Sequence, residues 1–147
     1  AILLHHHIGK NELNRGEWQH DYRIRFYNKN TAHWNNRSIH EKLLLQPNNQ
    51  VHKLKNKTLH YPAQSITAFE KKMDNYALLT AKQFQGEGRK AGWIKRRISP
   101  GFSFVLNYFF RLGFLDGATG YAAASILYRY TAKKYKLLQQ LNEGVSR

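Results

Sequence analysis

The chain has 147 residues, and its 24 Lys and Arg against nine Asp and Glu give a formal net charge of +15. Hydrophobic residues make up 41% of the chain, which excludes a disordered tail and allows one domain with a modest core. The absence of Cys excludes disulfide bonds and Cys-ligated zinc. So basic a surface attracts polyanions: nucleic acid, anionic lipid headgroups or phosphate-bearing small molecules.

The first residues read as the end of a strand, and the first of them is not Met. We therefore expect the chain to be a piece of a longer protein. Three histidines, His5 to His7, continue into Ile8, Gly9 and Lys10 without a linker, which favours native sequence over the remnant of a tag. No apolar run reaches the roughly 18–20 residues that a membrane-spanning helix needs.

Residues 1–62 are predicted to be rich in β-structure. The segment 22–27 alternates with a period of two, which places Tyr22, Ile24 and Phe26 on one buried face. Residues 32–34 predict a short extended segment, and a further strand is expected over 39–45, closed by a turn at 46–49. Residues 51–59 alternate again, and three of their positions are expected to point inward: Val51, Leu54 and Leu59.

Residues 63–147 are predicted to form about four helices. Thr67, with capping-box spacing to Glu70, and Ser65 are equally good N-caps. From Ser65 on, apolar residues recur every three or four positions, at Ile66, Phe69, Met73, Tyr76 and Leu79 or Thr80. Gly86 and Gly88 are expected to end this helix. A short basic helix over 89–98, broken at Ser99-Pro100-Gly101, precedes helices over 102–115 and 118–141, with a turn at Asp116-Gly117 between the last two. The sequence therefore predicts an α+β fold, a strand-rich part followed by a helical part.

Several motifs follow one another in an order known from a family of enzymes. They are Gly-Glu-Trp-x-x-Asp-Tyr-x-x-Arg-Phe over 16–26, Ile-His-Glu over 39–41, Leu-His-Tyr over 59–61, Tyr-Phe-Phe-Arg-Leu-Gly-Phe-Leu-Asp-Gly over 108–117 and Lys-Lys-Tyr-Lys-Leu over 133–137. In this order they resemble the second half of bacterial family 2 glycosyltransferases, in particular the group that builds the lipopolysaccharide core. The Leu-Gly-Phe-Leu-Asp-Gly block is the most specific of them.

The resemblance implies a GT-A fold and sugar transfer with inversion at the anomeric carbon. Such an enzyme needs a general base for the acceptor hydroxyl. The family position of that base falls on Asp21, with Glu17 as the competitor, and a wall of Trp18 and Tyr22 would raise the proton affinity of a carboxylate there. The alternative for Asp21 is a purely structural role, in an ion pair with Arg23 or Arg25.

The resemblance also suggests a metal ligand and contacts with the substrate. His40 is the candidate ligand for a divalent metal, held in the right tautomer by Glu41, although a lone His on a strand is more often structural. The predicted substrate-binding residues are Trp18, Arg23, Arg25, Trp34 and Glu41, and for the two Trp a place in the core is the alternative.

One part of the family pattern is missing. The Asp-x-Asp that holds the metal and the donor pyrophosphate occurs nowhere in the 147 residues. The chain thus reads as the acceptor-side half, and the divalent metal (Mg or Mn) and the donor nucleotide-sugar are expected in the full-length enzyme.

The helical part combines clustered cations with aromatic residues. The predicted membrane-surface cations are Arg89, Lys90, Lys95, Arg96, Arg97, Lys133 and Lys134. Next to them in the sequence lie Phe102, Phe104, Tyr108, Phe109, Phe110 and Phe114. Three interpretations stay open for these aromatics: a core between antiparallel helices that pack through small residues on 118–125, contact with anionic lipid, or an oligomer surface.

The leading hypothesis is thus a glycosyltransferase half that acts on a lipid-linked saccharide at the cytoplasmic face of the membrane. A basic nucleic-acid-binding module is a second hypothesis, disfavoured because no helix-turn-helix spacing, zinc-ligand set or RNP-like motif is found. A non-catalytic membrane-associated scaffold is a third. Exposed strand edges over 1–62 would favour pairing with another chain and hence a homo-oligomer.

Overall fold

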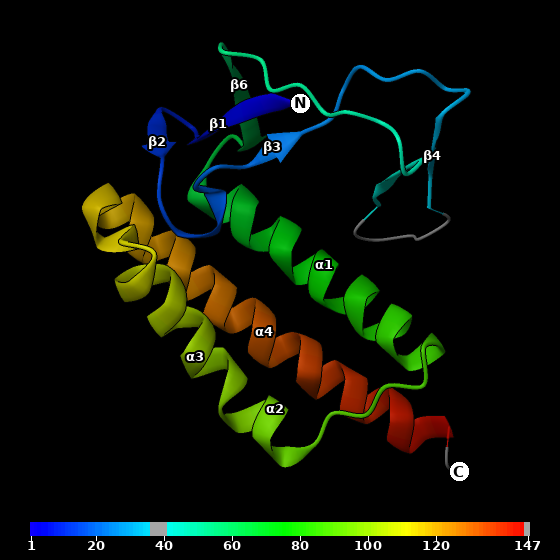
Figure 1. Cartoon of the computed structure of the whole chain (residues 1–147). Helices are drawn as coiled ribbons and strands as arrows, with labels where there is room; N and C mark the ends of the chain where they lie inside the picture. The colour runs from blue at the N-terminus through cyan, green and yellow to red at the C-terminus, as the bar shows by residue number, and fades with distance from the viewer. Residues whose placement is uncertain (36–40, 146–147) are drawn as a thin grey trace.

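The computed structural model describes residues 1–35 and 41–145, with side chains to Gly144. They form the predicted α+β fold, in which a small mixed sheet lies at one end of a group of helices (Figure 1). Strand β1 (Ile2–Ile8) is central in the sheet. It pairs antiparallel with β2 (Asn11–Leu13) and β3 (Tyr22–Arg23), and parallel with β6 (Lys57–Ala63).

Strand β1 alternates between two environments. Leu4, His6 and Ile8 are buried, whereas His5 and His7 between them are only half-buried. Side chains of a strand point to opposite faces in turn, so the three consecutive histidines divide between the two faces of the sheet. This division places one of them on the side of the helices and two on the outer side.

The alternating segment 22–27 is a shorter strand than predicted. Strand β3 contains only Tyr22 and Arg23, which pair with Leu3 and Ile2, and beyond that point β1 offers no further backbone partner. The expectation of a buried face is therefore wrong for Phe26, which is 81% exposed. It is wrong for Tyr22 as well, which is also exposed, whereas Ile24 is half-buried.

The next strands also differ in part from the prediction. Strands β4 (Ala32–Trp34) and β5 (Leu43–Leu45) form a separate antiparallel hairpin, and residues 36–40 between them lie outside the described part. The segment 51–56 is not a strand, because β6 begins only at Lys57, where β1 becomes available as a partner. The expected inward positions Val51, Leu54 and Leu59 are all exposed.

Helix α1 (Ile66–Gly86) has a side-chain cap at its start and a glycine-dependent ending. The Ser65 hydroxyl accepts a hydrogen bond from the Ala68 N–H at 3.1 Å, so the N-cap is Ser65 and not the alternative Thr67. At the other end Gly88 has a left-handed φ of +70°, and its N–H reaches the Gln85 carbonyl while the Arg89 N–H reaches that of Phe84. This is a Schellman ending, and it explains the need for glycine at position 88.

Proline 100 begins a helix instead of breaking one. Helix α2 (Trp93–Arg97) is followed directly by α3 (Ser99–Val105), with Pro100 in the first turn, where its missing N–H costs nothing. The predicted helix over 102–115 is in fact three pieces. After α3 come a π-helical segment, η2 (Leu106–Phe110), and a 3₁₀ turn, η3 (Gly113–Asp116).

Helix α4 (Gly117–Val145) runs beside α1 in the same direction, with α3 antiparallel to it (Figure 1). Two ion pairs join α4 to α1, from Arg129 to Glu70 at 3.2 Å and from Lys133 to Asp74 at 2.9 Å.

The buried core under the sheet is formed by Ile8, Leu13, Phe69, Ala123 and Ile126. On α1 the buried face passes through Phe69, Ala77, Thr80 and Ala81. Of the predicted stripe, Phe69 is thus buried, and so is Thr80 of the two alternatives, whereas Tyr76 and Leu79 are exposed. No helix in the described ranges has both the length and the apolar character needed to cross a bilayer.

Candidate carboxylate site beneath the sheet

The two predicted catalytic carboxylates lie on the connection between β2 and β3. Glu17 belongs to a 3₁₀ turn, η1 (Gly16–Trp18), and Asp21 directly precedes β3. The Gly16 N–H donates to the Arg111 carbonyl at 3.1 Å, and the Asp21 carbonyl accepts from the Leu4 N–H at 3.0 Å. The backbone of this segment is thus tied at one end to the helical part and at the other end to the sheet.

Asp21 is held by two partners. Its Oδ1 lies 2.6 Å from Nε of Arg23, and its Oδ2 lies 3.0 Å from Nε2 of His6. The side chain is 16% exposed, so a part of it remains open to solvent. The ion pair with Arg23 that the sequence left open is present, whereas Arg25 lies in a different place. Each carboxylate oxygen has two lone pairs, so these contacts leave room for a further donor such as a sugar hydroxyl.

A second histidine continues this line of contacts. Nδ1 of His60, on β6, lies 3.1 Å from Nδ1 of His6. Because a carboxylate only accepts hydrogen bonds, Nε2 of His6 carries the proton toward Asp21, and its Nδ1 accepts the N–H of His60. Burial lowers the pKa of both imidazoles, which opposes the effect of the Asp21 charge. The outcome is a row of three side chains, from β1, β6 and the residue before β3, that fixes the orientation of the carboxylate.

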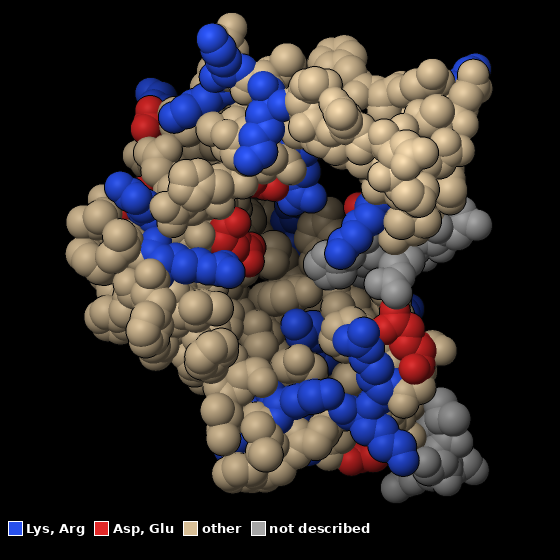
Figure 2. Space-filling view, viewed as in Figure 1, with Lys and Arg blue, Asp and Glu red and all other residues tan. Residues whose placement is uncertain are grey.

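Glu17 has a different environment. Its side chain is accessible to solvent, yet protein surrounds it closely enough for desolvation to raise the pKa of its carboxyl group. The positive charges of Arg111 and Lys134 act against this rise, and the negative charge of Asp21 adds to it. Figure 2 shows the molecule hollowed between the sheet and the helices, with acidic and basic side chains on the walls.

Trp18 belongs partly to the core. It is half-buried, it packs against the buried cluster under the sheet, and its ring meets that of Phe69 edge-on at a centroid distance of 5.9 Å. Much of the Trp18 side chain is therefore part of the core, as the alternative interpretation expected. Its remaining area lines a groove together with Gln19 and His20, directly beside Asp21 in the sequence.

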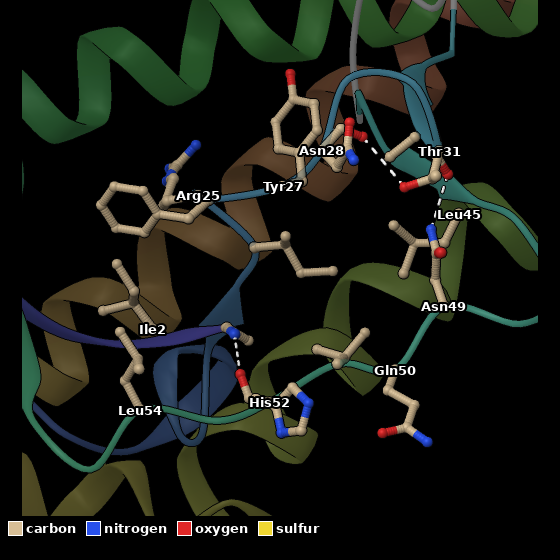
Figure 3. Close-up of a pocket in the computed structure, with 15 residues that line it drawn as sticks. Ile2, Arg25, Tyr27, Asn28, Thr31, Leu45, Asn49, Gln50, His52 and Leu54 are labelled. Atoms are coloured by element: carbon tan, nitrogen blue, oxygen red, sulfur yellow. Dashed lines mark hydrogen bonds between the residues drawn. The ribbon is translucent and has the colours of Figure 1, made fainter.

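Arg25 lines a separate pocket of about 500 Å³ (Figure 3). The pocket is formed by the start of β1, residues 24–28, the β4–β5 hairpin and residues 49–54. Tyr27 also lines it, and the hydroxyl of Tyr27 accepts a hydrogen bond from Nε1 of Trp34 at 2.8 Å. Arg25 and Tyr27 thus line this pocket, and Trp34 is hydrogen-bonded to Tyr27, whereas Asp21 is not among the lining residues.

The predicted metal ligand His40 lies outside the described residues. Its neighbour Glu41 is described and is exposed, just before β5. The described residues around Asp21 hold no set of three ligand atoms close enough for a metal ion, because the one such group in the described part is elsewhere, on β1 and β2.

The seven predicted membrane-surface cations fall into two sets. Exposed side chains without an acidic partner in the described part are those of Lys90, Lys95 and Arg97, at or near α2. The others are engaged: Arg89 with Glu87 at 2.9 Å, Arg96 with Gln139, and Lys133 with Asp74. Lys134 is half-buried among aromatic rings, with Nζ 4.7 Å from the centroid of Tyr130. Figure 2 shows Lys and Arg gathered over the end of the helical part where α2 lies.

Most of the aromatic residues in this region are not core. Phe110 is 74% exposed, and Phe102, Phe109 and Phe114 are exposed as well, so the core interpretation is wrong for these four. Phe104 and Tyr108 are half-buried and make the aromatic contacts with Tyr121. Five of the exposed apolar residues recur at spacings of three or four along α2, α3 and η2 and are called the apolar stripe below: Ile94, Ile98, Phe102, Val105 and Phe109.

Comparison with known proteins adds no family assignment. No protein-family model matches the chain, and no solved structure matches it. The interpretation of the site therefore depends on its residues and their geometry.

Three residues of the site were not identified from the sequence. His6, His60 and Arg111 surround the two carboxylates, although they lie far from positions 17 and 21 in the chain. His6 could have been found from the alternation of β1, which turns one histidine of three toward the core. Arg111 could not, because its proximity depends on the junction between η1 and η2.

Proposed function

We propose that this chain forms the acceptor side of an inverting glycosyltransferase, with Asp21 as the general base, and that it works on a lipid-linked saccharide at an anionic membrane surface. The observation that carries the proposal is the fixed, partly open carboxylate of Asp21, held between Arg23 and His6. A base that is already oriented loses little entropy when the acceptor hydroxyl arrives. The motifs shared with family 2 enzymes support the same role.

The proposed reaction has one chemical step. The acceptor hydroxyl donates its hydrogen bond to Asp21, and its oxygen attacks the anomeric carbon from the face opposite the nucleotide. As the new C–O bond forms, the bond to the nucleotide phosphate breaks, and the diphosphate leaves with the electron pair. The proton moves to the carboxylate of Asp21, and the contacts of Arg23 and His6 keep that carboxylate in place during the transfer.

A divalent cation in such enzymes neutralises the charge of the leaving diphosphate. The described residues around Asp21 do not fit one, and His40 lies outside them. The proposal therefore assigns the cation and the donor to the half of the enzyme that would carry the Asp-x-Asp, and the chain described here provides the base and the acceptor surface.

The membrane part of the proposal depends on the helical surface. An exposed apolar stripe along α2, α3 and η2 lies beside the exposed cations Lys90, Lys95 and Arg97. No Asp or Glu occurs between Glu87 and Asp116, so nothing in that segment repels an anionic headgroup. Apolar side chains flanked by cations are the pattern of helices that lie in the bilayer interface. A lipid-linked acceptor would be held at the same surface.

The experiment that tests the proposal is a sugar-transfer assay with the chain joined to its nucleotide-binding half. Labelled nucleotide-sugar is incubated with membranes that carry the lipid-linked saccharide, and the label in the lipid fraction is measured. We expect transfer by the wild type and its loss in Asp21→Asn. Transfer at the wild-type rate by the Asn variant, or binding to duplex DNA in preference to anionic vesicles, would contradict the proposal.

A further inference from the structure

A second group of titratable side chains lies on the outer face of the sheet, away from Asp21. His5 and His7 alternate with His6 along β1 and therefore point to the face opposite the His6–Asp21 contact. Glu12 on β2 lies directly across from His7 in the antiparallel register. The hairpin thus brings two imidazoles and one carboxylate together, although the site proposed above uses none of them.

The ligand atoms of these three residues are close to one another. All of them lie within 4.8 Å, and Nε2 of His5 lies 3.6 Å from Oε2 of Glu12. A tetrahedral ion with bonds of 2.0–2.1 Å places neighbouring ligand atoms about 3.3 Å apart. Small side-chain rotations would therefore bring the group to the geometry of a metal site, without a change in the backbone.

The polar atoms of the group differ in their hydrogen bonding. Nε2 of His7 is buried and has no hydrogen-bond partner in the described part of the chain, while its ring rests against Tyr61 at a centroid distance of 5.2 Å. A buried ring nitrogen without a partner is uncommon, because its desolvation is not offset. By contrast, Nε2 of His5 contacts Oδ1 of Asn14 at 2.9 Å, and Nδ2 of Asn14 donates to Glu12 at 3.0 Å.

We infer that His5, His7 and Glu12 form a binding site for a transition-metal ion of the Zn²⁺ type. Two imidazoles and a carboxylate suit Zn²⁺ and its neighbours in the first transition row better than Mg²⁺, which prefers oxygen ligands alone. The Asn14 oxygen beside His5 is placed to approach a fourth position. His5, Glu12 and Asn14 line the same groove as Trp18, Gln19 and His20, with a volume of about 740 Å³, so the ion would be reached from solvent.

Such a site would have a structural consequence. It would connect β1 to β2 next to the segment that carries Glu17 and Asp21, on the sheet face that these carboxylates do not use. The inference does not depend on the proposed sugar transfer, since it concerns metal affinity alone, and the assay that tests it contains no sugar.

The test is a titration of the 147-residue chain, made without a polyhistidine tag and freed of metal with a chelator. Isothermal titration with Zn²⁺ in the presence of about 10 mM Mg²⁺ is expected to give one ion per chain, because Mg²⁺ does not compete for imidazole nitrogen. His7→Gln and Glu12→Gln should each weaken the affinity by at least about tenfold, the loss seen even for residues that only support metal ligands. The double variant His33→Ala, His52→Ala removes two exposed histidines outside the group and should bind as the wild type does.

Two further readouts make the result decisive. With Co²⁺ as the probe, the wild type should show visible absorption bands of a low-coordinate site, and Glu12→Gln should lose them; Glu12 is exposed, so this variant keeps the fold even where His7→Gln does not. The inference is overturned if Glu12→Gln binds Zn²⁺ as tightly as the wild type. It is also overturned if the His33 and His52 variant loses as much affinity as the hairpin variants do.

Discussion

Oδ2 of Asp116 accepts a hydrogen bond from the backbone N–H of Arg15 at 2.8 Å, across 101 residues of sequence. The same oxygen accepts the N–H of Asn14 at 2.9 Å. Asp116 ends the 3₁₀ turn η3 before α4, whereas Arg15 and Asn14 lead into the turn that carries Glu17. One side chain of the Leu-Gly-Phe-Leu-Asp-Gly block therefore connects the helical part to the loop of the candidate site.

Replacement of Asp116 is expected to loosen this connection. Asp116→Ala leaves two backbone N–H groups without their charged acceptor, which should lower the free energy of unfolding by about 2 kcal/mol. Asp116→Asn keeps an oxygen in place and should cost less. Urea denaturation of the two variants and the wild type measures the difference, and equal stabilities would show that the connection is unimportant.

Gly113 of the same block and Gly120, three residues beyond its end, allow a close approach of backbones. A Cβ on Gly120 would lie 1.9 Å from the Gly113 carbonyl oxygen, so Gly120→Ala forces α4 away from η3. We expect a loss of about 3 kcal/mol or more, at or beyond the usual range for overpacked positions. Gly86→Ala is the matched control: nothing lies within 4 Å of its Cβ, and Ala should stabilise the end of α1 by about 0.5–1 kcal/mol. Thermal unfolding of both variants is the measurement, and similar shifts for the two would contradict the packing.

Glu17 should make stability depend on pH. Burial raises its pKa in the folded state above the ordinary value of 4.5, so the folded chain holds this proton more tightly than the unfolded chain does. The free energy of unfolding then falls as pH rises through the window that starts near 4.5 and ends at the raised value. Glu17→Gln removes this loss, so the variant should be more stable than the wild type at pH 7 and no more stable below pH 4.5. Urea denaturation at both pH values checks this, and a variant less stable at pH 7 would contradict the direction of the shift.

Binding to anionic vesicles should depend on the cations of α2. Each cation near an anionic surface contributes about 1 kcal/mol, so the double variant Lys95→Ala, Arg97→Ala should bind vesicles roughly 30-fold more weakly. The control Lys10→Ala, Lys29→Ala removes the same charge from exposed positions in the strand-rich part and should bind nearly as the wild type does. Co-sedimentation with phosphatidylserine vesicles is the measurement. Equal losses in the two double variants would mean that only the net charge matters.

Much of the helical part could be predicted from the sequence because its signals are local. The Ser65 cap, the ending at Gly88 and the turn before α4 each depend on residues within one helical turn. Where the prediction was wrong, the structure of the segment depended on contacts with residues far away in the sequence. Tyr22 to Tyr27 has the alternation of a strand, but β1 pairs with only two of these residues. Phe109 and Phe110 have the apolar character of core residues, yet both are exposed, and Ala123 of α4 packs in the cluster of Ile8, Leu13 and Phe69 instead.

The candidate site was predictable only in part for the same reason. Asp21 is predicted from a motif, and Arg23 is named with Arg25 as its alternative ion-pair partner. The contact with His6 depends on the pairing of β1 with β3, and the contact with His60 depends on the parallel pairing of β1 with β6. Glu17 acquires its raised pKa from a surface formed by η1 and the helices. No pattern in residues 16–27 contains that information.

The choice between the two carboxylates is the most direct test of the proposed reaction. In the enzyme completed by its nucleotide-binding half, kcat and KM for the acceptor are measured for Asp21→Asn and Glu17→Gln under identical conditions, after both variants are shown to be folded. Loss of a general base lowers kcat by about 10²–10⁴-fold. We predict a fall of at least about 100-fold in kcat for Asp21→Asn with KM little changed, and less than about tenfold for Glu17→Gln. The reverse order, or two variants with wild-type kcat, would contradict the assignment of Asp21 as the base.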